Sequence, residues 1–169
     1  RSIYHTPMGR ILPAQPTDQV FEEPFRAQIN ATGTRHPVTA GLLDADGKTP
    51  EWAHWYRHVD ATVQRGETVM TGIDGKPLLI LDRIGKGRVA EFMSDHVWLW
   101  ARGHENGGPH AELIRRLVHW LMKEPDLEEE DLRAVVDGDK LTIIRRSLQE
   151  QVPPVTVTGP ARTAKGSVK

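Results

Sequence analysis

A serine, an aspartate and a histidine stand in succession at Ser94, Asp95 and His96. A carboxylate can orient an imidazole and a hydroxyl can act as a nucleophile, so these three side chains could support hydrolysis. Consecutive residues of a strand point to opposite faces, so the three converge only if a strand has ended before them. The alternative is a polar strand end whose side chains cap nearby backbone groups, and we favour that interpretation.

Two tryptophans and a histidine follow this group and are candidates for ligand contact. Trp98 and Trp100 could stack on a sugar or bury against a partner, and His104 lies in the glycine-containing loop 103–109. The tryptophans could instead cover the core beneath that loop. We favour core packing, because tryptophan is largely buried in most proteins.

Metal ligation is a further possibility to weigh. The residues that could supply nitrogen and oxygen ligands to zinc near this segment are His104, His110, Asp95 and Glu105. His54 and His58 stand four residues apart, which would place them on one face of a helix. We expect both histidine pairs on the solvated surface, and we predict no metal and no other cofactor.

Several elements must position these side chains. Residues 78–82 and 88–93 predict two strands joined by a turn with Gly85 and Gly87, and residues 69–73 predict a third strand. Apolar residues at helical spacing predict a helix over 110–123. Polar groups just beyond the end of a strand are the usual place for a site in an open α/β sheet.

The two ends of the chain differ from this central part. Residues 1–35 are rich in proline and predict an irregular arm with one strand near 25–29, and residues 51–59 fit either a helix or a loop. Residues 132–136 and 140–146 flank a turn centred on Gly138, residues 152–158 are β-rich, and 161–169 are expected to fray. We therefore divide the chain into an α/β part at 1–127 and a small β appendage at 128–169.

Composition excludes several classes of function. The chain has 169 residues, a formal net charge of −1 and a mean hydropathy of −0.48, so it carries no basic field for nucleic acid. It has no apolar run long enough to span a bilayer, and we expect this segment to be soluble. Cysteine is absent, which removes disulfides and a thiolate nucleophile from these residues. Because the chain starts abruptly at Arg1, we expect it to be a piece of a longer protein.

A set of short motifs occurs in a fixed order: Arg35-His-Pro-Val-Thr-Ala-Gly-Leu42, Pro77-Leu-Leu, Gly85-Lys-Gly-Arg-Val89, Ser94-Asp-His96 and a helix ending in His119-Trp120. This order resembles the C-terminal half of class I glutamine amidotransferase-like domains, particularly the ThuA-like branch, over residues 35–120. It is closest to such domains inside large membrane-anchored bacterial proteins, several of which carry von Willebrand A-type domains.

The resemblance implies a partial flavodoxin-like sheet with flanking helices, followed by the β appendage. In active relatives a cysteine on a strand-to-helix elbow attacks glutamine, assisted by a His-Glu pair. His96 matches the histidine, but Val97-Trp98 stands where the acidic partner is expected, and the elbow would lie upstream of Arg1. We therefore expect a non-catalytic binding or scaffolding module, whose partner is the remainder of a parent protein anchored in the bacterial envelope.

Two other functions stay open from the sequence. The first is a ThuA-like or hydrolase-type enzyme that acts on a carbohydrate or an amide through His96. The second is an interaction module that forms homo-oligomers through an exposed strand edge. An apolar surface near residues 4–25, where the upstream half would dock, would favour the binding module over both.

Overall fold

The computed structural model describes residues 3–149 and 151–157, which belong to two compact units, residues 1–128 and 129–169. The first unit contains these strands and helices in chain order: β1 (Ala14–Phe21), β2 (Gln28–Ile29), α1 (Pro37–Ala40), β3 (His58–Val63), β4 (Glu67–Thr71), β5 (Pro77–Ile84), β6 (Gly87–Phe92), α2 (Val97–Ala101) and α3 (His110–Leu121). Short 3-10 helices lie at Ile3–His5, Pro7–Arg10, Ile73–Gly75, His104–Asn106 and Pro125–Leu127.

The central sheet has four strands in the order β2-β4-β5-β6, and every neighbouring pair is antiparallel. Its middle strand β5 carries four consecutive buried side chains, Leu78, Leu79, Ile80 and Leu81. A strand that is buried at successive positions must be covered on both faces of its sheet. Different elements pack against the two faces of this sheet.

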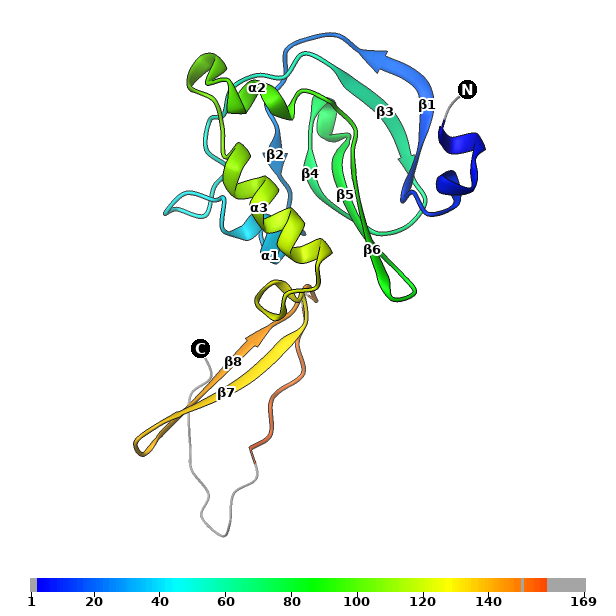
Figure 1. Cartoon of the computed structure of the whole chain (residues 1–169). Helices are drawn as coiled ribbons and strands as arrows, with labels where there is room; N and C mark the ends of the chain where they lie inside the picture. Colours follow the sequence, from blue (N-terminus) through cyan, green and yellow to red (C-terminus); the bar gives the residue numbers. More distant parts are fainter. Residues whose placement is uncertain (1–2, 150, 158–169) are drawn as a thin grey trace. The chain divides into compact units, whose positions relative to one another are not determined.

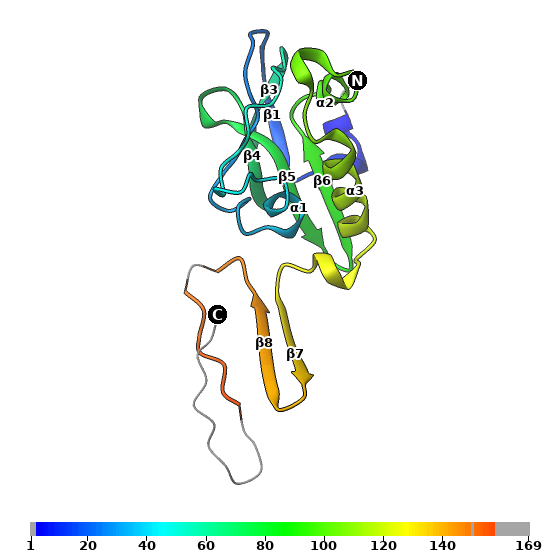
Figure 2. The ribbon, with the colours of Figure 1, turned by 90° about the vertical axis from the view of Figure 1, so that its left-hand side faces the viewer.

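On one side, α3 contributes Leu113, Leu117 and Trp120 to the main hydrophobic core, which also contains Leu79 and Leu81 of β5. On the other side, Ile80 packs in a smaller cluster with Ala14 of β1, Ala61 of β3 and Met93. Figures 1 and 2 show α1 and α3 on one side of β4, β5 and β6, and the antiparallel pair β1–β3 on the other.

The predicted mixed α/β character is confirmed, and so are the strands at 78–82 and 88–93 and the helix that begins at His110. All described strand pairs are antiparallel, whereas a flavodoxin-like sheet is parallel. For the β5–β6 pair the reason is local, because these strands are joined by only Gly85 and Lys86, with Gly85 at φ 56°. A connection this short permits only an antiparallel hairpin.

The expectation of an irregular N-terminal arm was wrong over residues 14–21, which form β1. This strand escapes a pattern-based prediction because it contains Pro16 and a residue with positive φ, Asp18, where its register with β3 shifts. The undecided segment 51–59 is irregular up to Arg57, and β3 begins at His58.

The second unit contains one hairpin, β7 (Asp131–Asp137) and β8 (Lys140–Arg146), with Gly138 at φ 61° in its turn, as the sequence predicts. Residues 152–157 lie outside any strand, so that β-rich segment was a wrong prediction over its described part. The predicted frayed end at 161–169 lies outside the described residues.

Candidate functional site

The segment 94–96 begins directly after β6, where the backbone leaves the sheet and turns into α2. The Ser94 side chain is buried, and its Oγ accepts a hydrogen bond from the backbone N–H of His96 at 3.1 Å. This is a serine turn, in which a hydroxyl takes the place of a backbone acceptor. Ser94 therefore caps the strand end, and no hydrogen bond joins its hydroxyl to the His96 ring in the described structure.

The imidazole of His96 is bound to the backbone of a distant segment. Its Nδ1 accepts a hydrogen bond from the backbone N–H of Tyr56 at 3.1 Å. A ring nitrogen that accepts carries no proton, so the proton of the neutral ring is on Nε2. The Asp95 carboxylate is 3.8 Å from that Nε2 and 3.8 Å from an Arg57 nitrogen, both too long for hydrogen bonds. The three candidate catalytic residues are thus neighbours without forming a triad.

The two tryptophans lie on the short helix α2 and have different environments. Trp100 is buried between Trp52 and Trp55, at ring distances of 5.1 and 4.8 Å, and its Nε1–H donates to the carbonyl of Ala53 at 3.1 Å. Trp98 is 50% exposed, and its ring stands edge-on to that of His96 at 6.3 Å. Trp98 is therefore the aromatic side chain that remains able to contact a ligand.

A polar cluster that the sequence does not predict lies at the Tyr56 side chain. The Tyr56 hydroxyl donates to Glu105 at 3.0 Å and lies 3.0 Å from the Nε2 of His104. The other oxygen of Glu105 accepts from the backbone N–H of His54 at 3.1 Å and is 2.6 Å from that residue's Nδ1. His104, a predicted ligand contact, is thus part of a four-residue network that Tyr56 joins to the His96 segment.

The hydrogen bonds of this network set the ionisation of its acid and its phenol. The backbone N–H of His54, then its side chain, then the Tyr56 hydroxyl lower the pKa of Glu105 to about 2. Its hydrogen bond to Glu105 raises the pKa of Tyr56. Glu105 is therefore a carboxylate, and Tyr56 a neutral donor, at any physiological pH.

The segment 53–56 is fixed by its backbone on both sides. Ala53 donates to the carbonyl of Gly107 at 2.9 Å, which adds to the bonds from His54 to Glu105 and from Tyr56 to His96. Between them, Trp55 exchanges two backbone hydrogen bonds of 2.9 Å with Phe25. The site is therefore a rigid surface built by a strand-like segment, the start of α2 and the 103–107 loop.

The expectation that His54 and His58 lie on the solvated surface was wrong for His58, and neither residue is in a helix. His58 begins β3 and is fully buried: its ring stacks on Phe25 at 5.2 Å, and its Nε2 donates to the carbonyl of Pro77 at 2.9 Å. Burial lowers the pKa of His58, which fits a structural and neutral imidazole. Among the described residues, no three His, Asp or Glu side chains are grouped so that they could hold a metal ion.

Comparisons of the chain with protein-family models, with curated proteins and with solved structures give no match. In the described residues, no helix has both the length and the apolar character needed to cross a membrane.

Proposed function

We propose that this chain is a non-catalytic, glutamine amidotransferase-like domain that serves as a binding or scaffolding module within a larger, membrane-anchored bacterial protein. The observation that carries this proposal is the hydrogen bond that the His96 ring accepts. Its Nδ1 accepts a hydrogen bond from the Tyr56 backbone N–H, so it carries no hydrogen that it could donate to an orienting carboxylate, as the Nδ1–H of a catalytic histidine does. The motif resemblance over residues 35–120 supports the amidotransferase-like part of the proposal, and the antiparallel central sheet departs from the parallel sheet of a flavodoxin-like fold.

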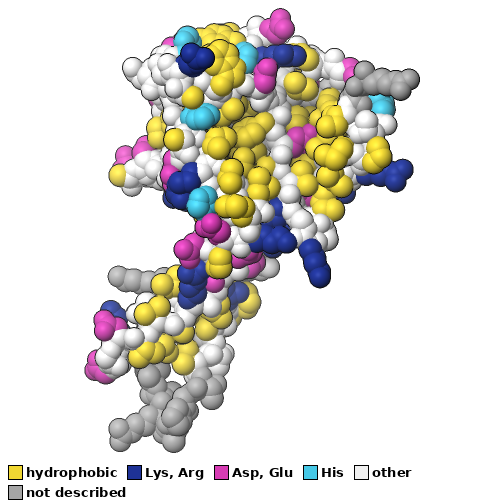
Figure 3. Space-filling view, viewed as in Figure 1, with side chains coloured by type: hydrophobic (Ala, Val, Ile, Leu, Met, Phe, Trp, Pro, Cys, Tyr) yellow, Lys and Arg dark blue, Asp and Glu magenta, His cyan; other side chains and the backbone are white. Residues whose placement is uncertain are grey.

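Exposed apolar side chains support docking to the rest of the parent protein. Near the N-terminus these are Ile3, Met8 and Val20, which are 42 to 52% exposed, and α3 together with the residue after it exposes Val118, Leu121 and Met122. Figure 3 shows hydrophobic side chains gathered over α3 and toward the N-terminal segment. Exposed apolar side chains of this kind favour a protein partner.

An assay of glutamine hydrolysis by the intact parent tests the absence of catalysis. We expect no glutamate release above background in the wild-type protein or in His96→Ala. Activity that depends on His96 would overturn the proposal.

A binding measurement tests the scaffolding part. The chain and the remainder of the parent, produced separately, should associate, and Ile3→Asp with Met8→Asp should weaken that association about tenfold, since charges at a buried apolar contact are costly. Val135→Asp is the matched control, because Val135 is a similarly exposed valine on β7 of the second unit. Equal affinities for the two variants would contradict docking through the N-terminal surface.

A second candidate is an enzyme that acts on a carbohydrate or an amide, and one observation favours it. The exposed Trp98 ring stands beside the partly exposed His96, so a sugar stacked on the indole would meet the free Nε2–H. Hydrolysis of chromogenic glycosides or amides that is lost in His96→Ala and kept in His110→Ala would favour this enzyme over the binding module.

The homo-oligomer is a third proposal, because β6 is the last strand of the central sheet and pairs only with β5 in the described structure. Light scattering over a range of concentrations tests it. A monomeric mass throughout would dismiss it.

A further inference from the structure

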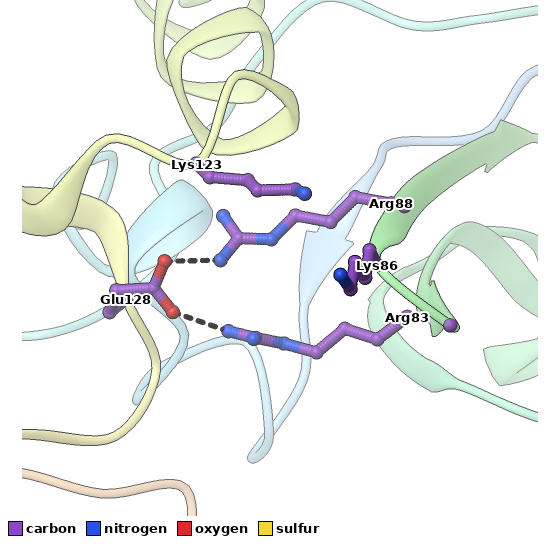
Figure 4. A pocket seen from close by; sticks show the side chains of 7 residues that line it. Arg83, Lys86, Arg88, Lys123 and Glu128 are labelled. Atoms are coloured by element: carbon purple, nitrogen blue, oxygen red, sulfur yellow. Dashed lines mark hydrogen bonds and ion pairs between the residues drawn. The ribbon is translucent and has the colours of Figure 1, made fainter.

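A cavity of about 250 Å³ lies at the turn between β5 and β6, beside the end of α3. The residues that line it are Arg83, Gly85, Lys86, Gly87, Arg88, Lys123 and Glu128, all in the first unit. Figure 4 shows the side chains of Arg83 and Arg88 reaching from the hairpin toward Glu128, with Lys123 next to Arg88. The cavity shares no residue with the His96 site.

The charges around this cavity do not balance. Four cationic side chains line it and a single carboxylate, Glu128, faces them. Lys86 and Lys123 are exposed, and neither makes an ion pair or a side-chain hydrogen bond with any residue that the structure describes. Like charges gathered this closely repel one another, so an added anion would relieve the repulsion.

The carboxylate that is present has the geometry of a bound oxyanion. One oxygen of Glu128 accepts from Arg83 at 2.7 Å and the other accepts from Arg88, so the carboxylate bridges two guanidinium groups. Bridging of this kind is how arginines recognise carboxylates and phosphates in general. Glu128 thus marks where an anion sits between these cations.

Contacts within the fold hold the side chain of Arg88 in place. Its side chain is 2% exposed, its guanidinium lies over the Trp120 ring at 5.0 Å, and it also donates to the Trp120 carbonyl. Its Nε–H is buried and has no hydrogen-bond partner in the described structure. A buried cationic donor without a partner is costly, so Glu128 and Trp120 do not fully satisfy this guanidinium.

We propose that this basic cavity binds a phosphate group, free or carried as a phosphomonoester, and that Glu128 is an internal carboxylate that competes with it. A dianionic phosphate suits this group of four cations, two of which are lysines without an ion pair in the described structure, better than a second carboxylate does. Lys86 and Lys123 provide positive charge that Glu128 does not neutralise. Arg83 and Arg88 exchange the Glu128 carboxylate for the phosphate.

Calorimetric titration of the whole 169-residue chain with inorganic phosphate, at constant ionic strength set by NaCl, tests the proposal. We expect millimolar binding to the wild type and about tenfold weaker binding to the double variant Lys86→Gln, Lys123→Gln, since two charge contacts are lost. Lys48→Gln is the control, because Lys48 is an exposed lysine of the 44–48 turn and lines no part of the cavity. The side chains of these exposed lysines make no ion pair or hydrogen bond with the described residues, so all three proteins should keep the same melting temperature.

Three further titrations separate the parts of the proposal. Glu128→Gln should bind phosphate more tightly than the wild type; an unchanged affinity would overturn the competition with Glu128. Free phosphoserine that binds more tightly than inorganic phosphate would identify a phosphomonoester as the ligand, and the reverse order would identify free phosphate. Acetate should bind more weakly than either. No phosphate binding by the wild type, or equal binding by the double variant, would overturn the site itself.

Discussion

The backbone N–H of Tyr56 donates to the Nδ1 of His96, a contact of 3.1 Å between residues forty positions apart in the chain. This bond joins the segment before β3 to the end of β6. The bond gives the His96 imidazole a structural role between these two segments. It also links Tyr56, whose hydroxyl contacts His104 and Glu105, to the ring of His96, which stands edge-on to the exposed Trp98.

Replacement of His96 tests the structural role of its ring. His96→Ala leaves the Tyr56 N–H without its acceptor and should lower the free energy of unfolding by about 1–2 kcal/mol. His96→Asn should recover part of this loss, because the asparagine Oδ1 occupies nearly the position of Nδ1 and can accept the same bond. Urea unfolding measures both. Equal losses for the two variants would contradict an acceptor role for the ring.

The two tryptophans of α2 offer a comparison within one short helix. Trp100→Ala removes a buried ring and should cost about 3–5 kcal/mol, whereas Trp98→Ala should change stability by less than about 0.5 kcal/mol. The same urea experiment decides this prediction. If Trp98 belongs to a binding face, its variant should lose ligand or partner affinity while keeping its stability.

The buried His58 makes stability depend on pH. Burial lowers the pKa of His58 in the folded state below the ordinary value of 6.5. As the pH falls, the unfolded chain therefore binds a proton at this residue before the folded chain does. Its contribution is fully present above pH 6.5 and is lost as the pH falls from there through the lowered folded pKa. NMR titration should give His58 a midpoint below 6.5. A midpoint at or above 6.5 would show that the ring is not held neutral as the geometry requires.

The carboxylate of Glu105 should titrate far below its ordinary pKa of 4.5, near the value of about 2 that its hydrogen bonds produce. The stability it contributes is present above pH 4.5 and is lost as the pH falls toward 2. His54→Ala removes one of its donors, so the midpoint should rise, as carboxyl NMR can measure. Glu112 is the internal control, because Arg115 and Arg116 lower its pKa independently of His54.

Elements whose structure depends on neighbouring residues could be predicted from the sequence. Strand β5 has an uninterrupted apolar run, Gly85 marks its turn, and the leucines of α3 recur at helical spacing, so each element carries its own signal. Strand β1 has no such signal. Its proline, its polar residues and its bulge make sense only through pairing with β3, which lies some forty residues later.

The candidate site also has a part that the local sequence predicts and a part that it does not. The strand end at Ser94 and its capping role follow from the position of the residue after an apolar run. The meeting of Tyr56 with His96 depends on the bridge between Phe25 and Trp55 and on the course of the 103–107 loop, in which Glu105 has φ 47°. These are long-range and strained features that no local pattern encodes. The polarity of Tyr56 and Glu105 predicts only that they lie at the surface, so the sequence does not predict their hydrogen bond.

NMR of the whole chain labelled with nitrogen-15 tests the role of the His96 ring most directly. We expect a proton on Nε2, none on Nδ1, and a coupling across the hydrogen bond between Nδ1 and the Tyr56 amide nitrogen. A proton on Nδ1 with no such coupling would contradict it, because the ring would then be free to pair with a carboxylate as a catalytic histidine does.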